Sequence, residues 1–334
     1  METVIINSTP HIRNPRTTKH IMLDVVIALL PTCIMGCIYF GWSALLVLAL
    51  STISAVATEV VWKLCQKKSF KQILDEFDYT SCITGLLIGM CMSASVKWYV
   101  PILASVFAIS IVKMLFGGTG KNIVNPAIVG RIFAFMSFTT IMNDFNATLT
   151  NGTIVSGATT LTNLLKGTAS DLTLGQMFLG INMAGCIGET CKLALVIGGL
   201  YLVVRRVIDI RWPLIYIITE GLIAAALAKD IAMFMPSILS GGLFLGAIFM
   251  ATDYVTSPNN KYACYAYYFV LGIITAVLRH ATQMEVVSFC ILIMNLFVPI
   301  FNMAFKPRPF GSKPIKDVCK DFFAKFLKKK EDVK

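Results

Sequence analysis

Long runs of apolar residues, separated by short polar stretches, recur along the whole chain. A helix needs about 20 mostly apolar residues to cross a hydrocarbon core of about 30 Å. The pattern predicts ten such segments, at residues 21–40, 43–64, 79–96, 98–116, 122–141, 181–204, 212–228, 236–253, 263–279 and 286–305. The third, fifth and eighth contain enough Gly, Pro and Ser to be irregular or broken. The expected fold class is therefore an all-α integral membrane protein of about ten transmembrane helices.

Composition agrees with this pattern. Of 334 residues, 56% are hydrophobic and 14% are charged, whereas soluble proteins carry about 25% charged residues. The chain cannot cover its surface with charge, so most of that surface faces the lipid bilayer. The first twenty residues are polar and no small-residue cleavage site follows, so we expect no cleavable signal peptide.

The net charge of +11 is distributed in a way that argues against a nucleic-acid partner. Lys and Arg gather before the first segment, after the second, fourth, sixth and eighth, and in the C-terminal tail, whereas the alternate loops hold few. This asymmetry is the positive-inside pattern for ten spans with both termini in the cytoplasm. It divides the chain into a cytoplasmic segment 1–20, a membrane domain 21–305 with an extracytoplasmic loop at about 142–180, and a basic cytoplasmic tail 306–334.

Two glycine-rich, proline-interrupted stretches lie within the membrane domain, one in each half. They are GGTGKNIVNPAIVGRIF (117–133) and LSGGLFLGAIFMATDYVTSPNN (239–260). Asn122 and Asn125 would share a face on a helix, whereas Pro126 disfavours helix at Asn125. The two asparagines either bind a ligand or satisfy the backbone at a helix break. Such paired stretches indicate two pseudo-repeated halves with broken helices near the centre, as in transporters.

Charged residues inside membrane segments are costly and tend to be paired or functional. Candidates in or at the ends of the predicted spans are Asp24, Glu59, Lys113, Arg131, Glu189, Lys192, Glu220 and Asp253. The ten cysteines include no CxxC pair and none of the spacings of a zinc or iron–sulfur site, so no metal site is predicted.

The extracytoplasmic loop contains TIVSGATTLT (153–162), with five hydroxyl side chains around a Gly-Ala pair. Together with GGTGKNIVNPAIVGR, GCIGE (185–189), FMATDYVTSP (249–258) and VVSFCILIMNLFVPIFN (286–302), this loop makes the chain resemble one family of membrane flavoproteins. The family comprises the D subunit of the Rnf complex and the B subunit of the sodium-pumping NADH:quinone reductase. The length, and the lack of a long N-terminal extension, favour the Rnf D subunit.

The resemblance implies that a flavin transferase, using FAD as donor, esterifies Thr159 to the phosphate of FMN. Ser156, Gly157 and Ala158 complete the acceptor motif, and Thr160 is a rival acceptor only if the motif is displaced by one residue. One departure stands out, because Thr153 occupies the position six residues before the acceptor where the family usually has Asp.

The resemblance also implies a noncovalent flavin, riboflavin or another, near Asn122, Asn125, Pro126 and Arg131. Cation coupling would fall first to Glu189 and Asp253 and next to Asp24, with Glu59 and Glu220 structural. The implied function is electron transfer between ferredoxin and NAD+ coupled to Na+ or H+ translocation, with other membrane and peripheral Rnf subunits, in a bacterial plasma or inner membrane. The alternatives are a channel or secondary transporter without flavin, and a subunit of the quinone reductase.

Overall fold

The structure, a computed structural model, describes residues 17–142, 147–148, 154–155, 173–181, 183 and 185–305. Within these residues the secondary structure is helical apart from one pair of two-residue strands. Strand β1 (Ala147–Thr148) pairs antiparallel with β2 (Ile154–Val155). The predicted all-α class is confirmed.

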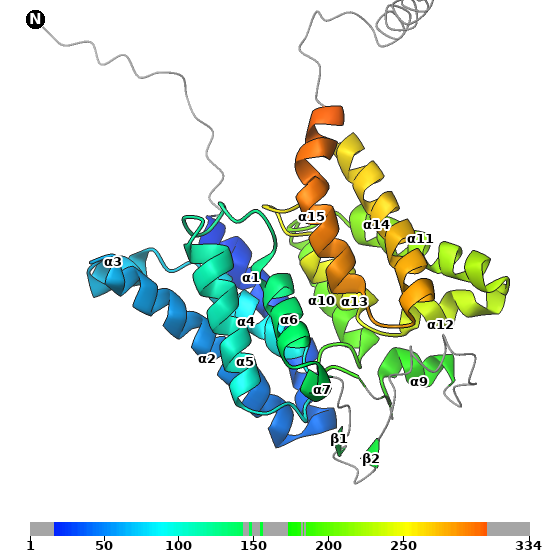
Figure 1. Ribbon diagram of the computed structural model, residues 1–334, viewed down its shortest axis with the longest axis horizontal. Helices are drawn as coiled ribbons and strands as arrows, with labels where there is room; N and C mark the ends of the chain where they lie inside the picture. The colour runs from blue at the N-terminus through cyan, green and yellow to red at the C-terminus, as the bar shows by residue number, and fades with distance from the viewer. Residues whose placement is uncertain are drawn as a thin grey trace, which may run out of the picture.

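The first half of the chain forms helices that gather on one side of the molecule (Figure 1). They are α1 (Thr18–Phe40), α2 (Trp42–Cys65), α3 (Phe70–Asp75), α4 (Thr80–Met90), α5 (Tyr99–Phe107), the π-helix η1 (Ala108–Met114), α6 (Pro126–Ser137) and α7 (Thr139–Met142). Helix α2 contacts α4 and α5, and α5 contacts α6.

The second half repeats this packing order. Its elements are α9 (Leu174–Leu179), α10 (Lys192–Val204), α11 (Arg211–Ala228), the 3-10 turn η2 (Ile231–Met233), α12 (Phe234–Leu239), α13 (Leu243–Leu245), the π-helix η3 (Gly246–Met250), α14 (Lys261–Thr282) and α15 (Val287–Ala304). Helix α11 contacts α12 and α14, α14 contacts α15, and α1 packs on α10 to join the halves. Helix α1 begins and α15 ends at one end of the molecule, and β1, β2 and α9 lie at the other (Figure 1).

All ten predicted segments contain helices, and in the described part of the chain five of these helices are long and apolar enough to span a membrane. These are α1, α2, α11, α14 and α15. The helical stretches 231–239 and 243–250 meet at a bend of 67° and form either a broken sixth span or a re-entrant loop. The other four segments hold the shorter apolar helices α4, α5 with η1, α6 and α10. Of the segments expected to be irregular, the third stops at Met90, the fifth becomes helical only at Pro126 and the eighth is the bent pair.

One expectation was wrong. The segment predicted at 181–204 does not form a continuous span, because α10 starts only at Lys192 and the preceding described residues are not helical. This stretch contains GCIGE, and its backbone forms hydrogen bonds with the C-terminal end of α4. The N–H groups of Ile187 and Gly188 donate to the carbonyls of Met92 and Met90 at 2.9 and 2.8 Å. The glycines permit this close approach, because a Cβ on Gly188 would lie 2.6 Å from the Cβ of Met90.

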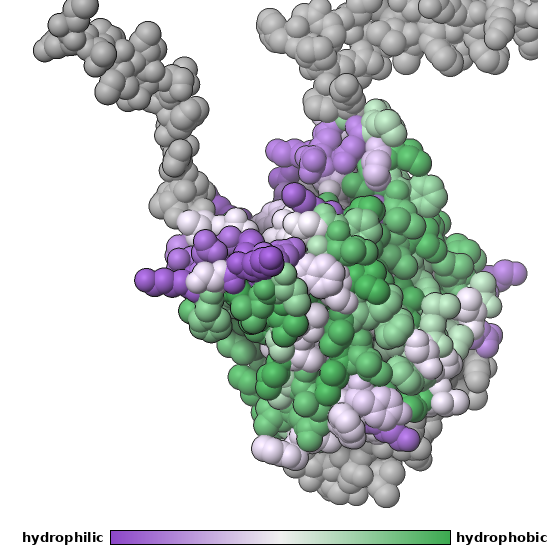
Figure 2. All heavy atoms as spheres, turned by 60° about the vertical axis from the view of Figure 1, so that its left-hand side comes forward, coloured by the Kyte–Doolittle hydropathy of each residue, from purple (hydrophilic) through white to green (hydrophobic). Residues whose placement is uncertain are grey.

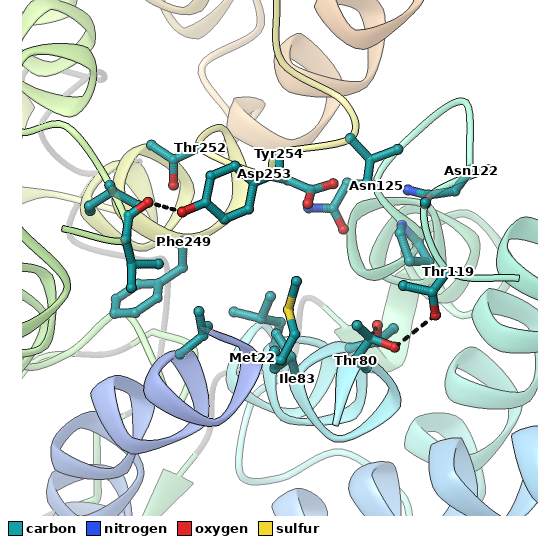
Figure 3. A pocket seen from close by; sticks show the side chains of 18 of the residues that line it. Met22, Thr80, Ile83, Thr119, Asn122, Asn125, Phe249, Thr252, Asp253 and Tyr254 are labelled. Atoms are coloured by element: carbon teal, nitrogen blue, oxygen red, sulfur yellow. Dashed lines mark hydrogen bonds between the residues drawn. The ribbon is translucent and has the colours of Figure 1, made fainter. Parts of the chain in front are cut away.

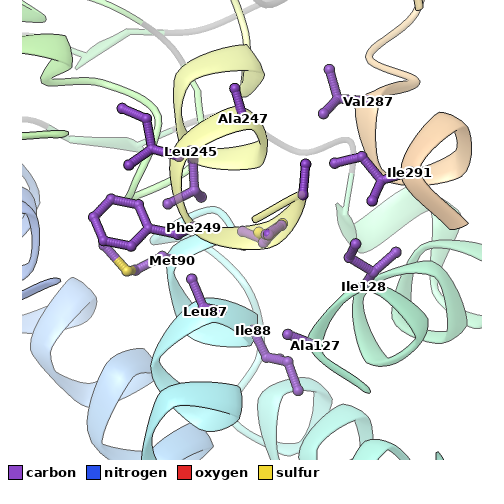
Figure 4. Packing of buried hydrophobic residues seen from close by; sticks show 14 of the residues in the cluster. Leu87, Ile88, Met90, Ala127, Ile128, Leu245, Ala247, Phe249, Val287 and Ile291 are labelled. Carbon is purple, nitrogen blue, oxygen red and sulfur yellow. The ribbon is translucent and has the colours of Figure 1, made fainter. Parts of the chain in front are cut away.

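The hydrophobic core lies where the broken elements meet (Figure 4). Its centre is formed by Leu87, Ile88 and Met90 of α4, Ala127 and Ile128 of α6, Leu245, Ala247 and Phe249 around η3, and Val287 and Ile291 of α15. Large apolar side chains also cover much of the outside (Figure 2), including Ile34 and Ile53, which are 57% and 66% exposed. An apolar core inside an apolar exterior is the arrangement expected of a chain surrounded by lipid.

Candidate functional site

A pocket lies between the ends of α1, α4, η1, α10 and η3 (Figure 3). It encloses about 830 Å³ of atom-free space, part of it open to solvent. Its polar lining consists of Thr80, Thr84, Lys113, Thr119, Asn122, Asn125, Thr252, Asp253 and Tyr254. Its apolar lining includes Met22, Ile83, Leu87, Leu202, Ile248 and Phe249.

One wall of the pocket is the glycine-rich loop between η1 and α6. Gly117, Gly118 and Gly120 have φ angles of 106°, 92° and 85°, a region that side chains with a Cβ rarely enter. The loop ends at Asn125, which caps α6: its Oδ1 accepts from the N–H of Ala127 at 3.0 Å. Pro126 then takes the first helical position, where its missing N–H costs nothing.

Asn122 and Asn125 both line the pocket, but not because they share a helical face, as the sequence suggested. Neither lies within a helix, so a shared helical face does not bring them together; the fold of the loop does. The Asn122 side chain donates to the carbonyl of Val124 at 3.1 Å, and that of Asn125 donates to the carbonyl of Met250 at 3.2 Å. Asn125 therefore satisfies two helix breaks at once, and Asn122 keeps its amide oxygen available at the pocket edge.

The opposite wall is the segment that follows η3, from Thr252 to Val255. The carboxylate of Asp253 accepts from the Thr256 hydroxyl at 3.0 Å. Within the part of the chain that the structure describes, no Lys, Arg or His side chain forms an ion pair with it. Asp253 thus brings to the pocket a carboxyl group that has no ion-pair partner among the described residues.

Lys113 also faces the pocket, although its charge is already balanced. Its Nζ lies 2.8 Å from Oε2 of Glu59 and 4.0 Å from Oδ1 of Asp78, and it donates to the hydroxyls of Thr80 and Ser81. Burial raises the pKa of Asp78, but attraction to Lys113 and hydrogen bonds from Thr119 and Thr80 outweigh burial, so its pKa lies below the usual range.

Arg131 and Glu189 lie away from the pocket, among buried ion pairs. Nη2 of Arg131 lies 3.3 Å from Oε1 of Glu189, and its Nη1 donates to the Ser288 hydroxyl at 2.7 Å. Lys192 donates to the carbonyl of Glu189. The structure therefore separates Arg131 from Asn122, Asn125 and Pro126, with which the sequence grouped it.

A second set of buried ion pairs was missed by sequence reasoning. Arg279, the last residue of the segment predicted at 263–279, was not among the candidate charges, yet it lies within α14 and is 2% exposed. Its Nη1 lies 2.7 Å from Glu220, and its Nη2 lies 3.0 Å from Glu285. Glu285 also accepts from the N–H of Gly242 at 3.3 Å, at the break between α12 and α13. Asp24, similarly, is held by Arg205 at 3.1 Å and by Tyr201 at 3.0 Å.

The predicted attachment motif of Ser156, Gly157, Ala158 and Thr159 lies outside the described residues, as does Thr153. In the sequence the motif directly follows β2, and β2 lies at the end of the molecule opposite to the beginning of α1 (Figure 1). Among the residues that the structure does describe, no group of three or more His, Cys, Asp or Glu side chains could hold a metal ion.

The fold and the site define a multi-pass helical membrane protein with broken helices around a central pocket. The chain belongs to the NQR2, RnfD, RnfE family, whose sequence model matches residues 5–311.

Curated relatives agree with this assignment. The chain is 38% identical over 318 residues to the D subunit of the Na(+)-translocating ferredoxin:NAD(+) oxidoreductase complex of Acetobacterium woodii, covering 94% of this chain and 98% of the relative. It is 33% identical over 325 residues to the D subunit of the proton-translocating ferredoxin:NAD(+) oxidoreductase complex of Clostridium ljungdahlii, covering 92% and 96%. It is 32% identical over 336 residues to the D subunit of the ion-translocating oxidoreductase complex of Stutzerimonas stutzeri, covering 88% and 92%.

Proposed function

We propose that this chain is the D subunit of an Rnf-type complex and carries electrons between ferredoxin and NAD+ on two flavins. One is FMN esterified to Thr159, and the other is a noncovalent flavin in the pocket. Flavins supply the redox chemistry, and the protein binds, orients and shields them. The names of the relatives support the complex. The pocket between the broken helices is the observation that carries the role of this chain.

The pocket suits a planar aromatic ring system. Apolar side chains such as Leu87, Ile248 and Phe249 offer flat contact, whereas Asn122 and Thr119 offer hydrogen bonds at the edge. This is the combination that an isoalloxazine, apolar on its faces and polar at one edge, requires.

The charges of the pocket favour an uncharged flavin. Lys113, the cation in the lining, is already neutralised by Glu59 and Asp78. Asp253 adds a carboxylate without an ion-pair partner in the described chain. Among the described residues of the lining, Lys113 is the cation that a phosphate group could meet, and its pairing with Glu59 makes that contact less favourable. Riboflavin therefore fits these residues better than FMN or FAD.

Attachment at Thr159 requires an accessible hydroxyl on an uncrowded backbone, and Gly157 and Ala158 meet that need. The Thr159 oxygen forms a bond to the phosphorus of the FMN half of FAD. The pyrophosphate bond of the donor breaks, and AMP leaves. The flavin transferase supplies the catalytic groups for this transfer.

The placement of the two sites supports electron transfer across the membrane. The pocket gathers residues near the beginnings of α1 and α4, whereas β2, which precedes the attachment motif, lies at the opposite end (Figure 1). With both termini in the cytoplasm of a bacterial cell, the pocket belongs to the cytoplasmic half and Thr159 to the outer face. Asp253 and Glu189, followed by Asp24, are the proposed residues for coupling to Na+ or H+.

The test is ultraviolet fluorescence of the denatured chain in a gel, after coexpression with a flavin transferase. We expect a fluorescent band in the native sequence and in Thr160→Ala, and none in Thr159→Ala. Acid release of flavin from the purified complex measures the noncovalent flavin separately. If the native chain carries neither flavin, while the transferase modifies a control substrate, the redox role is excluded.

A secondary transporter is the second candidate, favoured by the bent pair at 231–250 and the similar packing of the two halves. Such a protein would move its substrate without bound flavin, so the same flavin measurements decide between the two. A quinone reductase subunit would keep the flavins and differ in the electron acceptor, which assays of the complex with ferredoxin and NAD+ or with a quinone distinguish.

A further inference from the structure

Asn295 on α15 is a buried polar residue that the proposed function has not used. It is 2% exposed, and every hydrogen-bonding group of its amide has a partner. With the amide nitrogen facing the acceptors, Nδ2 lies 3.1 Å from the carbonyl of Thr256 and 3.0 Å from the hydroxyl of Tyr267. Its Oδ1 accepts from the backbone N–H of Asn125 at 3.3 Å.

These contacts matter because the segment after η3 leaves backbone carbonyls without helical partners. In a membrane such groups must be satisfied by other parts of the protein. Three of them are: Asn125 donates to the carbonyl of Met250, Tyr268 to that of Ala251 at 2.8 Å, and Asn295 to that of Thr256. Tyr268 contacts one wall of the pocket only. Asn295 contacts the Asp253 wall through Thr256 and the glycine-rich wall through Asn125.

We propose that Asn295 is a positioning residue that fixes the two walls of the pocket relative to each other. It does so from outside the lining, because it contacts Asn125, which lines the pocket, and Thr256, whose hydroxyl donates to the lining residue Asp253. The role in flavin binding rests on the proposed function, whereas the link between the walls does not.

The physical consequence follows from the cost of unsatisfied buried groups. Asn295→Leu keeps a similar volume and removes the amide, which leaves the N–H of Asn125 and the carbonyl of Thr256 without their partner. The two walls then separate or rotate until other partners are found. We expect the affinity for noncovalent riboflavin to fall at least tenfold, with covalent FMN on the same chain unchanged.

The experiment uses the purified complex in detergent and compares three variants with the native chain. Asn295→Leu removes the link, and Tyr267→Phe removes one partner of the amide while preserving shape. Tyr216→Phe is the matched control, since it deletes a buried hydroxyl, bonded to Thr275 at 2.9 Å, that does not line the pocket. Riboflavin affinity, the absorbance spectrum of the bound flavin and backbone hydrogen exchange are measured for each.

The expected order of riboflavin affinity is native chain and Tyr216→Phe highest, Tyr267→Phe lower and Asn295→Leu lowest. Exchange should rise at residues 121–126 and 250–256 in Asn295→Leu only. Native-like exchange at these residues in Asn295→Leu would overturn the link between the walls, and native-like riboflavin affinity in both Asn295→Leu and Tyr267→Phe would overturn its role in flavin binding. If the native chain binds no riboflavin, the proposed pocket function fails, and the exchange measurement still decides whether Asn295 links the walls.

Discussion

The pocket and the buried ion pairs of Arg131 and Arg279 lie in different parts of the molecule and handle charge in different ways. A third buried pair, Lys113 with Glu59, lies at the pocket itself. On α10, Lys192 bonds Glu189 at one end, whereas Leu202, ten residues and about 15 Å further along, lines the pocket. Arg131 contacts Glu189, and Arg279 contacts Glu220 and Glu285. At the pocket, Asp253 accepts from the Thr256 hydroxyl and forms no ion pair with any residue that the structure describes.

The difference teaches how to interpret charges in membrane segments. A buried charge with a partner stabilises the fold only weakly, but it becomes very costly when that partner is lost. A carboxylate beside a cavity without a cation is the arrangement that a transported ion or proton requires. The ion pairs of Arg279 therefore fit a role in the scaffold, whereas the pocket is where we propose that the flavin binds.

The largest effect should come from the ion pairs. Arg279→Met leaves Glu220 and Glu285 buried without a cation, and we expect a loss of about 3–5 kcal/mol in the free energy of unfolding. Thermal unfolding of the detergent-purified chain measures it. Lys68→Met, which breaks an exposed pair with Glu76, is the control and should leave the midpoint unchanged. Equal unfolding midpoints for Arg279→Met and Lys68→Met would show that the buried ion pairs of Arg279 do not stabilise the fold.

A smaller change in stability, with a large change in binding, should follow from filling the pocket. Thr252→Phe places a ring in the cavity, and we expect noncovalent flavin affinity to fall more than tenfold while the unfolding midpoint changes little. Thr282→Phe is the matched control, because each threonine hydroxyl donates to a carbonyl four residues earlier and Thr282 is exposed. Retained flavin in Thr252→Phe would place the binding site elsewhere.

The smallest effect on stability should come from Asp253→Asn, since no ion pair is broken. We expect fewer ions translocated per electron in vesicles that contain the complex, at an unchanged unfolding midpoint. Glu189→Gln serves as the comparison, because it also weakens the ion pair with Arg131 and should therefore lower the unfolding midpoint. Unchanged ion transport and electron transfer in both variants would exclude a coupling role for these residues.

The sequence predicted the ten apolar segments because hydropathy reports burial in lipid directly. It also predicted three of the breaks, since Gly and Pro interrupt helices whatever they pack against. The break before Lys192 was not predicted, because an apolar segment with two glycines is also compatible with a transmembrane helix. Its non-helical form depends on the carbonyls of Met90 and Met92, about a hundred residues earlier in the chain.

The pairing of charges could not be predicted for a similar reason. Arg131 meets Glu189, and Arg279 meets Glu220, across more than fifty residues in each case. Hydropathy indicates which residues enter the membrane, but not how each helix is rotated about its axis. Arg131 was grouped with Asn125 because the two are close in sequence, and the rotation of α6 separates them.

The short helices have a consequence for how a cell makes this protein. Helix α4, with 11 residues, extends about 16 Å, roughly half of the hydrocarbon thickness. Such a segment cannot leave the translocon as an independent span with its ends in water. Its unsatisfied end is completed by Ile187 and Gly188, which are synthesised much later. Membrane insertion of α4 is therefore coupled to folding of the later part of the chain. The first half cannot reach its final structure until residues 187–188 have been synthesised.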